Sequence, residues 1–424
     1  MKRKYLALAL TGVLSLALIL GGCGNKEDSS KGSQKKGDSE ITLMIPDWGA
    51  PTDEMLAKFK DETGITVHVQ PTAWDDIKSK VAIASAGKNA PADVIEVDWS
   101  WTGEFVSAGW LEALDVPQDT VKDIPSISYF TVDKKYYGVP YANGIRLAYL
   151  NEEMMKKAGL SSTPKTWDEM ESALETMKSK GVIEYPFLFP MNPEEKTTTS
   201  FLTLAFTKNG VIFNNDDTLN KESALNTLQQ LKSYLDKGLI DPATVSTPGI
   251  DTFRGINNAQ GAFLIGPTSF ITSSNDPKVS KVVGQIDNIP IPGKNGPAAK
   301  TISFTEAVGV SSFSKHKEEA KKFIEWFSRP ETQLELNKAI NNTPTRTSVI
   351  EEMAEKGIIK RPGAIIEQSK IVTTPFPNGV PKYYTKMSTE IFNLINQMGQ
   401  GKITPEDAAN KMEAAVSKLV KENK

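Results

Sequence analysis

Tryptophan and aspartate side chains gather at a few points in the first quarter of the chain. Four of the seven tryptophans occur between residues 48 and 101, and two of the four directly follow an aspartate. An indole face can stack on a flat apolar surface, and a carboxylate can accept hydrogen bonds from the rim of that surface. The residue types therefore predict a binding surface for a small molecule. Its members are Asp47, Trp48, Trp74, Asp98, Trp99 and Trp101.

The elements that must position these residues alternate between strand and helix patterns. Short apolar runs predict strands at residues 41–45, 65–70 and 93–97, and helical spacing of apolar residues predicts helices at 53–63 and 75–86. A β-α-β-α-β order implies right-handed crossovers and a parallel, doubly wound sheet. The loops that follow the three strands then open on one sheet edge, which is where such sheets hold their ligands.

The rest of the chain predicts a second domain, because 424 residues are too many for one typical core. Thr166 and Glu169 have the spacing of a capping box at the start of one of its helices. A late strand at residues 307–310 precedes a strongly amphipathic helix. Other helices are predicted at 152–158, 167–180, within 201–206 and 224–235, from Pro330, and from Pro405, with strands at 147–151 and 262–265.

The first residues of the chain have the pattern of an export signal. A positive segment, Lys2-Arg3-Lys4, precedes an apolar stretch over residues 5–20 that is short for a membrane span. The segment Leu20-Gly21-Gly22-Cys23 resembles the bacterial lipobox. This resemblance implies a lipoprotein signal peptide over residues 1–22 and a Cys23 that carries fatty acyl chains such as palmitate. Residues 23–39 are then predicted to be a flexible, lipidated tether, rich in Ser, Gly and Lys.

Composition excludes several functional classes. The formal net charge is −3, and removal of the signal takes away three positive charges, so a nucleic-acid partner is not predicted. Cys23 is the only cysteine, which leaves no intramolecular disulfide. His68 and His316 are isolated from each other and from Cys23, so the sequence predicts neither a metal site nor a cofactor.

A series of short motifs, in this order and spacing, is similar to a known family. They are Pro91-Ala92-Asp93-Val94, Gly109-Trp110-Leu111, Tyr137-Gly138-Val139-Pro140-Tyr141, Thr166-Trp167-Asp168-Glu169, Gly238-Leu239-Ile240-Asp241-Pro242 and Pro344-Thr345-Arg346. With them the chain resembles the lipid-anchored solute-binding proteins of ABC importers, of the carbohydrate type related to maltose-binding protein. The resemblance extends over essentially the whole chain after the signal.

The resemblance implies an α/β fold of two lobes, each a sheet flanked by helices, with a hinge between them. The amino-terminal lobe would take residues 40–144 and 303–343, and the carboxyl-terminal lobe residues 145–302 and 344–424. Such a protein is a monomer and not an enzyme. It captures a di- or oligosaccharide in the cleft between the lobes and delivers it to the permease transmembrane subunits, at the extracellular face of the cytoplasmic membrane.

The remaining site residues are predicted at the crossings between lobes and near the carboxyl terminus. Asn143, Arg146 and Glu306 lie at the predicted crossings, where a cleft floor would be. After Gly266 the family often has a tryptophan, whereas this chain has Pro267-Thr268-Ser269. Tyr383-Tyr384 is at the position where related proteins supply an aromatic residue and could substitute, and Tyr383 is the predicted contact.

Two other functions fit the same residues. Aromatic rings beside carboxylates also suit a polyamine or a quaternary amine, and an excess of Asp and Glu over Arg in the cleft would favour such a cation. A secreted glycosidase needs two carboxyl groups about 5–10 Å apart, one of them with a raised pKa. Asp47, Asp98 and Glu306 could converge in this way, but no segment resembles a nucleophile motif. The glycosidase therefore ranks last.

Overall fold

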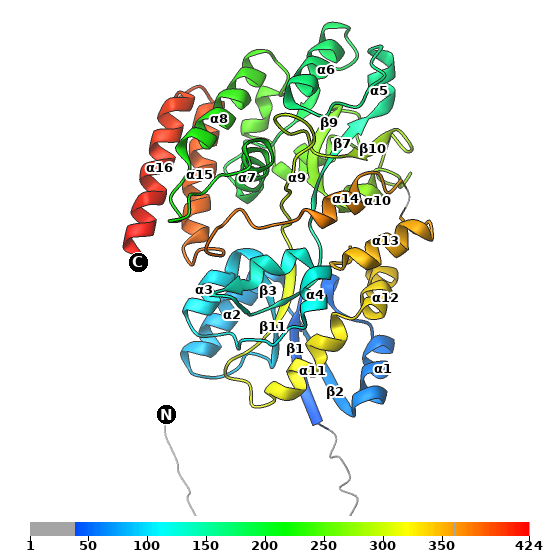
Figure 1. The fold of residues 1–424 in the computed structure, drawn as a ribbon, viewed down its shortest axis with the longest axis vertical. Coiled ribbons are helices and arrows are strands. Elements are labelled where there is room, and N and C mark those ends of the chain that lie inside the picture. Colours follow the sequence, from blue (N-terminus) through cyan, green and yellow to red (C-terminus); the bar gives the residue numbers. More distant parts are fainter. Residues whose placement is uncertain (1–38, 360, 424) are drawn as a thin grey trace, which may run out of the picture. The chain divides into compact units, whose positions relative to one another are not determined.

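The computed structural model of the chain describes residues 39–359 and 361–423, and two β-sheets surrounded by helices form its framework (Figure 1). The predicted signal peptide, Cys23 and almost all of the predicted tether lie outside the described residues. Ser39, the last residue of that tether, is the first residue of strand β1.

The first sheet has five strands in the order β2-β1-β3-β11-β6. Strand β1 pairs in parallel with β2 and β3, as predicted from the alternating strand and helix patterns. Strand β11 comes from a distant part of the chain and inserts antiparallel between β3 and β6. The bounds are β1 Ser39–Ile45, β2 Ile65–Pro71, β3 Val94–Asp98, β6 Val139–Ala142 and β11 Glu306–Val310.

Local signals at its ends explain where the first long helix, α1 (Asp53–Thr63), begins and stops. The side chain of Thr52 accepts a hydrogen bond from the backbone N–H of Met55, and Gly64 adopts the left-handed conformation at the other end. Phe59 packs on Phe323 with ring centroids 5.4 Å apart. The helices α2 (Trp74–Ala86), α11 (Lys317–Phe327) and α12 (Pro330–Ile340) were also predicted, and the structure confirms them.

The second sheet has four strands in the order β10-β7-β9-β8. Strand β7 is antiparallel to both β10 and β9, and β8 is parallel to β9. The bounds are β7 Arg146–Asn151, β8 Phe187–Leu188, β9 Phe263–Pro267 and β10 Ile286–Ile289. The predicted capping box of Thr166 and Glu169 starts helix α6 (Trp167–Ser179).

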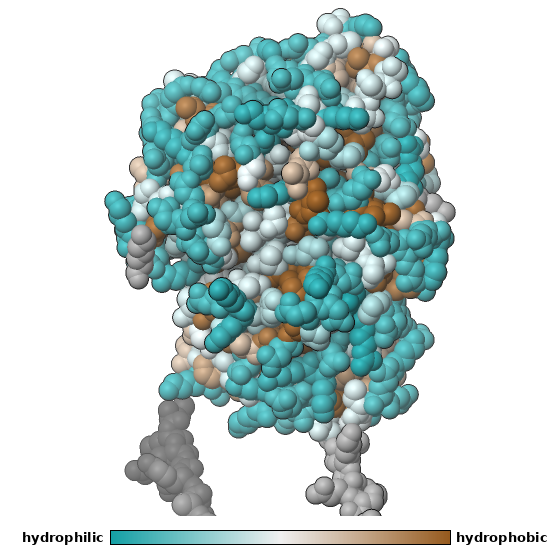
Figure 2. All heavy atoms as spheres, in the orientation of Figure 1, coloured by the Kyte–Doolittle hydropathy of each residue, from teal (hydrophilic) through white to brown (hydrophobic). Residues whose placement is uncertain are grey.

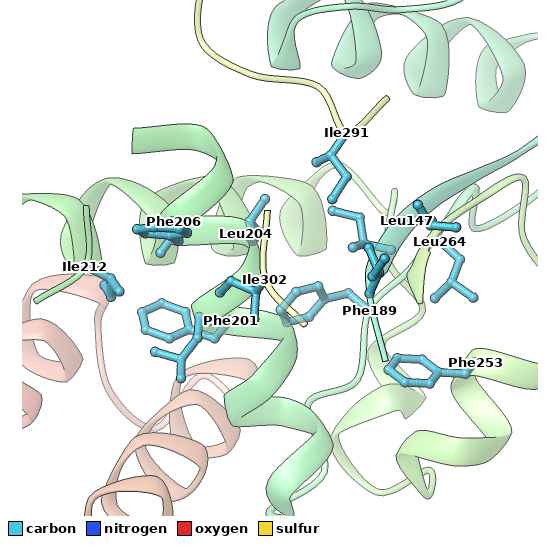
Figure 3. Close-up of a cluster of buried hydrophobic side chains, with 14 of the residues drawn as sticks. Leu147, Phe189, Phe201, Leu204, Phe206, Ile212, Phe253, Leu264, Ile291 and Ile302 are labelled. Carbon is cyan, nitrogen blue, oxygen red and sulfur yellow. The ribbon is translucent and has the colours of Figure 1, made fainter. Parts of the chain in front are cut away.

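The core beside the second sheet is built around helix α7 (Glu195–Asn209), in which every residue from Thr197 to Thr207 is buried. Figure 3 shows Phe201, Leu204 and Phe206 of this helix among apolar side chains of the sheet and its loops. Burying so many faces of one helix explains why its apolar pattern is weakly amphipathic. Trp167 and Trp326 are core residues, each 3% exposed.

The other described elements connect and cover these sheets (Figure 1). The α-helices are α3 Thr102–Ser107, α4 Gln118–Asp123, α5 Glu152–Lys157, α8 Lys221–Asp236, α9 Gly249–Arg254, α10 Ser269–Ser273, α13 Thr347–Glu355, α14 Ile365–Lys370, α15 Tyr384–Gly399 and α16 Pro405–Glu422. The short 3-10 helices are η1 Asp47–Gly49, η2 Trp99–Trp101, η3 Pro125–Phe130 and η4 Pro242–Val245. A small hairpin pairs β4 Thr131–Val132 with β5 Lys135–Tyr136.

Candidate functional site

Asp98 ends the central strand of the first sheet and begins the adjoining 3-10 helix η2. Its Oδ1 accepts hydrogen bonds from the backbone N–H of Ser100, at 2.8 Å, and from the Ser100 hydroxyl. These bonds cap η2, because an aspartate at this position satisfies an N–H that the helix leaves free. Asp98 is only 4% exposed, since all five residues of β3 are buried.

Two more acidic residues lie on the same face of the first sheet as Asp98. Glu306 of β11 is directly opposite Asp98 in the antiparallel register, and Val308 is opposite Glu96. Residues i and i+2 of a strand face the same way, so Glu96, Asp98 and Glu306 are neighbours. Glu96 is 0% exposed, and the Tyr141 hydroxyl donates a hydrogen bond to its Oε2 at 2.9 Å.

Burial raises the pKa of all three of these carboxyl groups. The pKa of Glu96 rises to about 8. That of Glu306 rises well above its usual value, because burial is reinforced by the negative charges of Asp98 and Glu96. Burial also raises the pKa of Asp98, to about 6, although the hydrogen bonds from Ser100 and the positive charge of Lys78 oppose this rise. At neutral pH the negative charge of this group therefore concentrates on Asp98.

A fourth acid, Glu195, is the first residue of helix α7, and its side chain is exposed in part. The hydroxyls of Tyr384 and Ser388, both on α15, donate hydrogen bonds to its two carboxylate oxygens. Loss of water around its carboxyl group raises its pKa to about 7, and the negative charge of Asp98 adds to the effect. The fold thus brings Glu195, at the start of the helix in the core beside the second sheet, close to the acids of the first sheet.

Trp99 lies in a cluster of aromatic rings that joins η2 to the carboxyl-terminal part of the chain. Its ring centroid is 4.6 Å from that of Tyr384 and 4.7 Å from that of Phe304. Phe376 stacks nearly parallel to it at 6.3 Å, and Tyr129 meets it edge-on at 5.9 Å. Trp99 is consequently only 4% exposed.

The other predicted tryptophans do not join this cluster. Trp101 is 4% exposed, and its ring centroid is 4.8 Å from that of the half-buried Trp74. Trp48 and Asp47 lie in η1, where both are exposed. Trp48, at 48%, is the most exposed tryptophan, on a protein whose drawn face is mostly hydrophilic with scattered apolar areas (Figure 2). A Cβ at Gly49 would collide with Tyr141, so η1 lies close to the residue that binds Glu96.

Arg146 carries a buried positive charge beside the aromatic cluster. Its guanidinium carbon lies 4.5 Å from the centroid of the Phe304 ring, a cation–π geometry. Burial lowers its pKa to about 10. The Nε atom of Arg146 is buried and has no hydrogen-bond partner among the described residues. A buried donor of this kind is available to an acceptor on a bound molecule.

Asn143 joins three passages of the chain between the two sheets. Its side-chain Nδ2 donates to the carbonyl of Pro344 at 3.3 Å, and its Oδ1 accepts a hydrogen bond from the Ser303 hydroxyl at 2.5 Å. Its backbone N–H donates to the carbonyl of Thr343 at 3.0 Å. Next to it, a side chain at Gly144 would collide with the carbonyl oxygen of Phe304. The side chain of Asn143 therefore helps to hold the crossings together.

Of the predicted pair Tyr383-Tyr384, Tyr384 is the residue that meets Trp99. Tyr383 is half-buried, and burial raises its pKa to about 12. Glu96 could have been found from the sequence, because it alternates with Asp98 in an otherwise apolar strand. No local signal marks Glu195 or Phe304, since their roles come from contacts with distant segments.

Carboxyl groups beside aromatic rings and one guanidinium can bind a molecule that has both apolar faces and hydroxyl groups. Within the described part of the chain, no group of three or more His, Cys, Asp or Glu residues is placed to hold a metal ion. Among the helices of residues 39–359 and 361–423, none is both long and apolar enough to cross a membrane.

Comparisons with known proteins identify the family of the chain. The family described as "Bacterial extracellular solute-binding protein" matches residues 54–363. A binding protein of Brucella abortus is 28% identical over 300 residues, which are 68% of this chain and 71% of its own. The galactooligosaccharide-binding protein of Bacillus subtilis is 22% identical over 419 residues, 96% of this chain and 95% of its own.

Among solved structures, the sugar-binding protein MalE of Xanthomonas citri superposes with a TM-score of 0.77 at 21% identity. The match covers 91% of this chain and 98% of that protein. The chain therefore has the two-lobed α/β fold, with a sheet flanked by helices in each lobe, and the predicted fold class is confirmed.

Proposed function

Because this chain belongs to the bacterial extracellular solute-binding protein family, we propose that it is the substrate-binding component of an ABC sugar importer. It captures a di- or oligosaccharide between its lobes and delivers it to the permease transmembrane subunits. The observation that carries the proposal is the grouping of Asp98, Glu306 and Glu195 beside the rings of Trp99 and Tyr384. The galactooligosaccharide specificity of the Bacillus subtilis relative supports the same substrate class.

The chemistry of a sugar ring matches these groups. Its C–H faces are apolar and stack on aromatic rings, while its hydroxyl rim donates to carboxylates and accepts from guanidinium. Covering about 100 Å² of apolar surface stabilises a complex by roughly 2.5 kcal/mol, or about two decades in affinity. The proposed contact residues are Asp47, Trp48, Trp74, Asp98, Trp99, Trp101, Asn143, Arg146, Glu306 and Tyr383, to which we add Glu195 and Tyr384.

Solute entry requires the lobes to separate. Trp99 and Tyr384 are in direct contact, at 4.6 Å between centroids, so no sugar ring fits between them in this arrangement. We propose an amino-terminal lobe of residues 40–144 and 303–343, a carboxyl-terminal lobe of 145–302 and 344–424, and a hinge at the crossings that Asn143 joins. Rotation at these few residues would open the cleft while each lobe stays rigid.

The family is extracellular, and we propose that lipidated Cys23 holds the monomeric protein at the outer face of the cytoplasmic membrane. Replacement of Cys23 by serine should move the protein from the membrane fraction to the soluble fraction of the cells that produce it. Retention of this variant in membranes would show that another anchor exists.

The second candidate solute is a polyamine or quaternary amine. The observation that favours it is the charge balance of the site, where the acids Glu96, Asp98, Glu306 and Glu195 face a single buried base, Arg146. An ammonium group would be stabilised by carboxylates and by aromatic faces. Protonation of several of these acids near neutral pH weakens this attraction, so the saccharide remains first.

A thermal-shift screen of residues 23–424 with Cys23→Ser separates the candidates. The panel contains mono- to pentasaccharides, polyamines and quaternary amines. A ligand at 100 times its Kd stabilises the folded protein by about 2.7 kcal/mol, which is a measurable rise in Tm. A rise with one saccharide series that remains intact supports the proposal. A rise with amines alone favours the second candidate, and shortened saccharides would identify a glycosidase.

A further inference from the structure

Glu96 is a fully buried acid that lies behind the proposed site, and one of its two carboxylate oxygens lacks a hydrogen-bond partner. Its Oε2 accepts the Tyr141 hydroxyl at 2.9 Å, but its Oε1 is buried and has no partner among the described residues. A buried carboxylate oxygen without a donor is strongly destabilising. A proton on this group or on its neighbour would remove the penalty.

Glu306 is that neighbour. Its carboxyl group lies within hydrogen-bonding reach of both Glu96 and Asp98, and its Oε2 is also buried without a partner. Two ionised carboxylates only accept hydrogen bonds, so they cannot bond to each other. One proton on Glu306 turns the unpaired oxygens into a carboxyl–carboxylate hydrogen bond, which is among the stronger kinds.

We propose that Glu96 and Glu306 are positioning residues for Asp98: a proton held by Glu306 is shared between the carboxyl groups of Glu96 and Asp98, so that ionisation of Glu96 changes how Asp98 binds the solute. The inference rests on the proposed function, because Asp98 is taken to contact the solute. In this proposal Glu306 acts on the solute through Asp98 and does not contact the solute directly.

The surrounding charges define which acids hold protons. Burial raises the pKa of Glu96 to about 8 and that of Glu306 well above its usual value, whereas the Ser100 hydrogen bonds keep the pKa of Asp98 at about 6. The other charges that act on Asp98 come from Lys78 of α2, which is paired with Glu104 at 2.6 Å, and from Glu195 of α7. Tyr141 of β6 and Tyr384 of α15 stay neutral, because burial raises the pKa of each well above its usual value.

A change of pH therefore moves the shared proton. Near neutral pH Glu96 and Glu306 are protonated, and Glu306 donates to the Asp98 carboxylate. Above about pH 8, Glu96 ionises, and its new charge attracts the Glu306 proton away from Asp98. Asp98 then loses a donor without any change in its own ionisation.

The direct test follows the ¹³Cγ shift of Asp98 in ligand-free protein between pH 5 and pH 9. Its resonance is assigned by its loss in Asp98→Asn. We expect two inflections in the wild type, one near its own pKa of about 6 and one near the Glu96 pKa of about 8. Glu96→Gln should remove only the upper inflection. The matched control Glu171→Gln, at a half-buried acid of α6 that pairs with Lys237, should leave both.

Tyr141→Phe is the second variant, and it does not depend on Glu96→Gln folding. The Tyr141 hydrogen bond lowers the pKa of Glu96, so its loss should move the upper inflection to higher pH. Identical Asp98 curves in the wild type, Glu96→Gln and Tyr141→Phe would overturn the proton-sharing arrangement.

Affinity supplies the second readout. For a saccharide that binds, the wild-type Kd should weaken about tenfold between pH 6.5 and pH 9, the effect of one lost hydrogen bond to a charged group, and the Glu96→Gln Kd by less than about twofold. Equal weakening in both proteins would overturn the positioning role. If no saccharide binds at all, the proposed function fails, and the Asp98 titration alone decides whether the carboxyl groups are coupled.

Discussion

The two sheets bury polar groups in different ways. In the core of the second sheet, Thr203 and Thr207 of helix α7 donate their hydroxyls to the backbone carbonyls of Thr199 and Thr203, each at 2.7 Å. These hydrogen bonds lie within one helix and satisfy both hydroxyls, although the hydroxyl of Ser200 in the same helix is buried without a partner among the described residues. In the first sheet, the buried polar groups are carboxyls from β3 and β11, and Glu96 Oε1 and Glu306 Oε2 find partners only if protons are present.

This difference separates buried polarity that maintains a core from buried polarity that serves a site. A threonine bonded to its own helix stays satisfied whatever the protein binds and whatever the pH. The carboxyl groups of the first sheet depend on distant segments, on protonation and on the solute that we propose for them. A ligand can change polar contacts that join distant segments of the chain and that leave some atoms without hydrogen-bond partners.

Two aromatic truncations, one beside each sheet, should have the largest effects. Trp99→Ala and Phe201→Ala remove rings that are 4% and 0% exposed. Each should lower the free energy of unfolding by about 3–5 kcal/mol in denaturant titrations. Only Trp99→Ala should also weaken saccharide binding, by about two decades, because its ring is a proposed stacking surface.

Affinity is measured by titration calorimetry under conditions where both variants are folded. Equal affinities of Trp99→Ala and the wild type would mean that Trp99 is a core residue like Phe201, and the proposed site would have to move.

The pH dependence of stability should come from the first sheet. The pKa of Glu96 is about 8 in the folded protein against a usual 4.5, so its contribution to stability is complete below pH 4.5 and is lost as pH rises through about 8. The free energy of unfolding should therefore fall between pH 5 and pH 8, by roughly 3 kcal/mol. Asp98 and Glu195 contribute in the same direction, because their pKa values are raised as well.

Denaturant titrations of the wild type and Glu96→Gln over this pH range measure the effect. The slope of stability against pH should be shallower in Glu96→Gln, since glutamine does not titrate. A wild-type stability that rises with pH would show that these acids are ionised in the folded protein.

Tyr384→Phe should have a smaller effect. It removes one of the two hydroxyl donors to Glu195 while keeping the ring that meets Trp99. Loss of a hydrogen bond to a charged group should destabilise the protein by about 1–2 kcal/mol at pH 8 and less at pH 6, where Glu195 is protonated. The matched variant Tyr383→Phe, without such a bond to Glu195, should be nearly neutral. Equal destabilisation by both changes would contradict this role of Tyr384.

Thr203→Val should have the smallest effect. The hydroxyl of Thr203 donates within its own helix, so its loss should change the free energy of unfolding by about 1 kcal/mol or less. The change should be the same at pH 5 and pH 8, because no titratable group is involved. A change that depends on pH would contradict the proposed difference between the buried polar groups of the two sheets.

Much of the local structure could be predicted from the sequence. The capping box of Thr166 and Glu169, the left-handed Gly64 and the parallel strands β1, β2 and β3 all follow from residue types and spacing within short windows. The sequence also located Asp98 at the end of a strand. The caps depend on contacts between residues that are near in the chain, and the parallel pairing follows from the alternation of strands and helices.

The candidate site was predicted only in part. Asp98, Trp99 and Glu306 come together in the structure, whereas Trp48 is exposed on η1 and Trp101 pairs with Trp74. Strand patterns indicated which residues follow a strand. They did not indicate which of these side chains are buried by distant parts of the protein. Trp99 is buried because segments from 304, 376 and 384 close over it.

The sequence by itself determined most of the long helices although not α15, most of the strands although not β8 and β10, the export signal pattern and the residue types available for binding, because periodicity, caps and composition act locally. Only the tertiary structure decided that β11 inserts antiparallel beside β3, that Glu306 meets Glu96 and Asp98, and that Glu195 approaches them from α7. Those contacts join segments up to about two hundred residues apart, and the pKa of each acid depends on the burial and the neighbours that such contacts create.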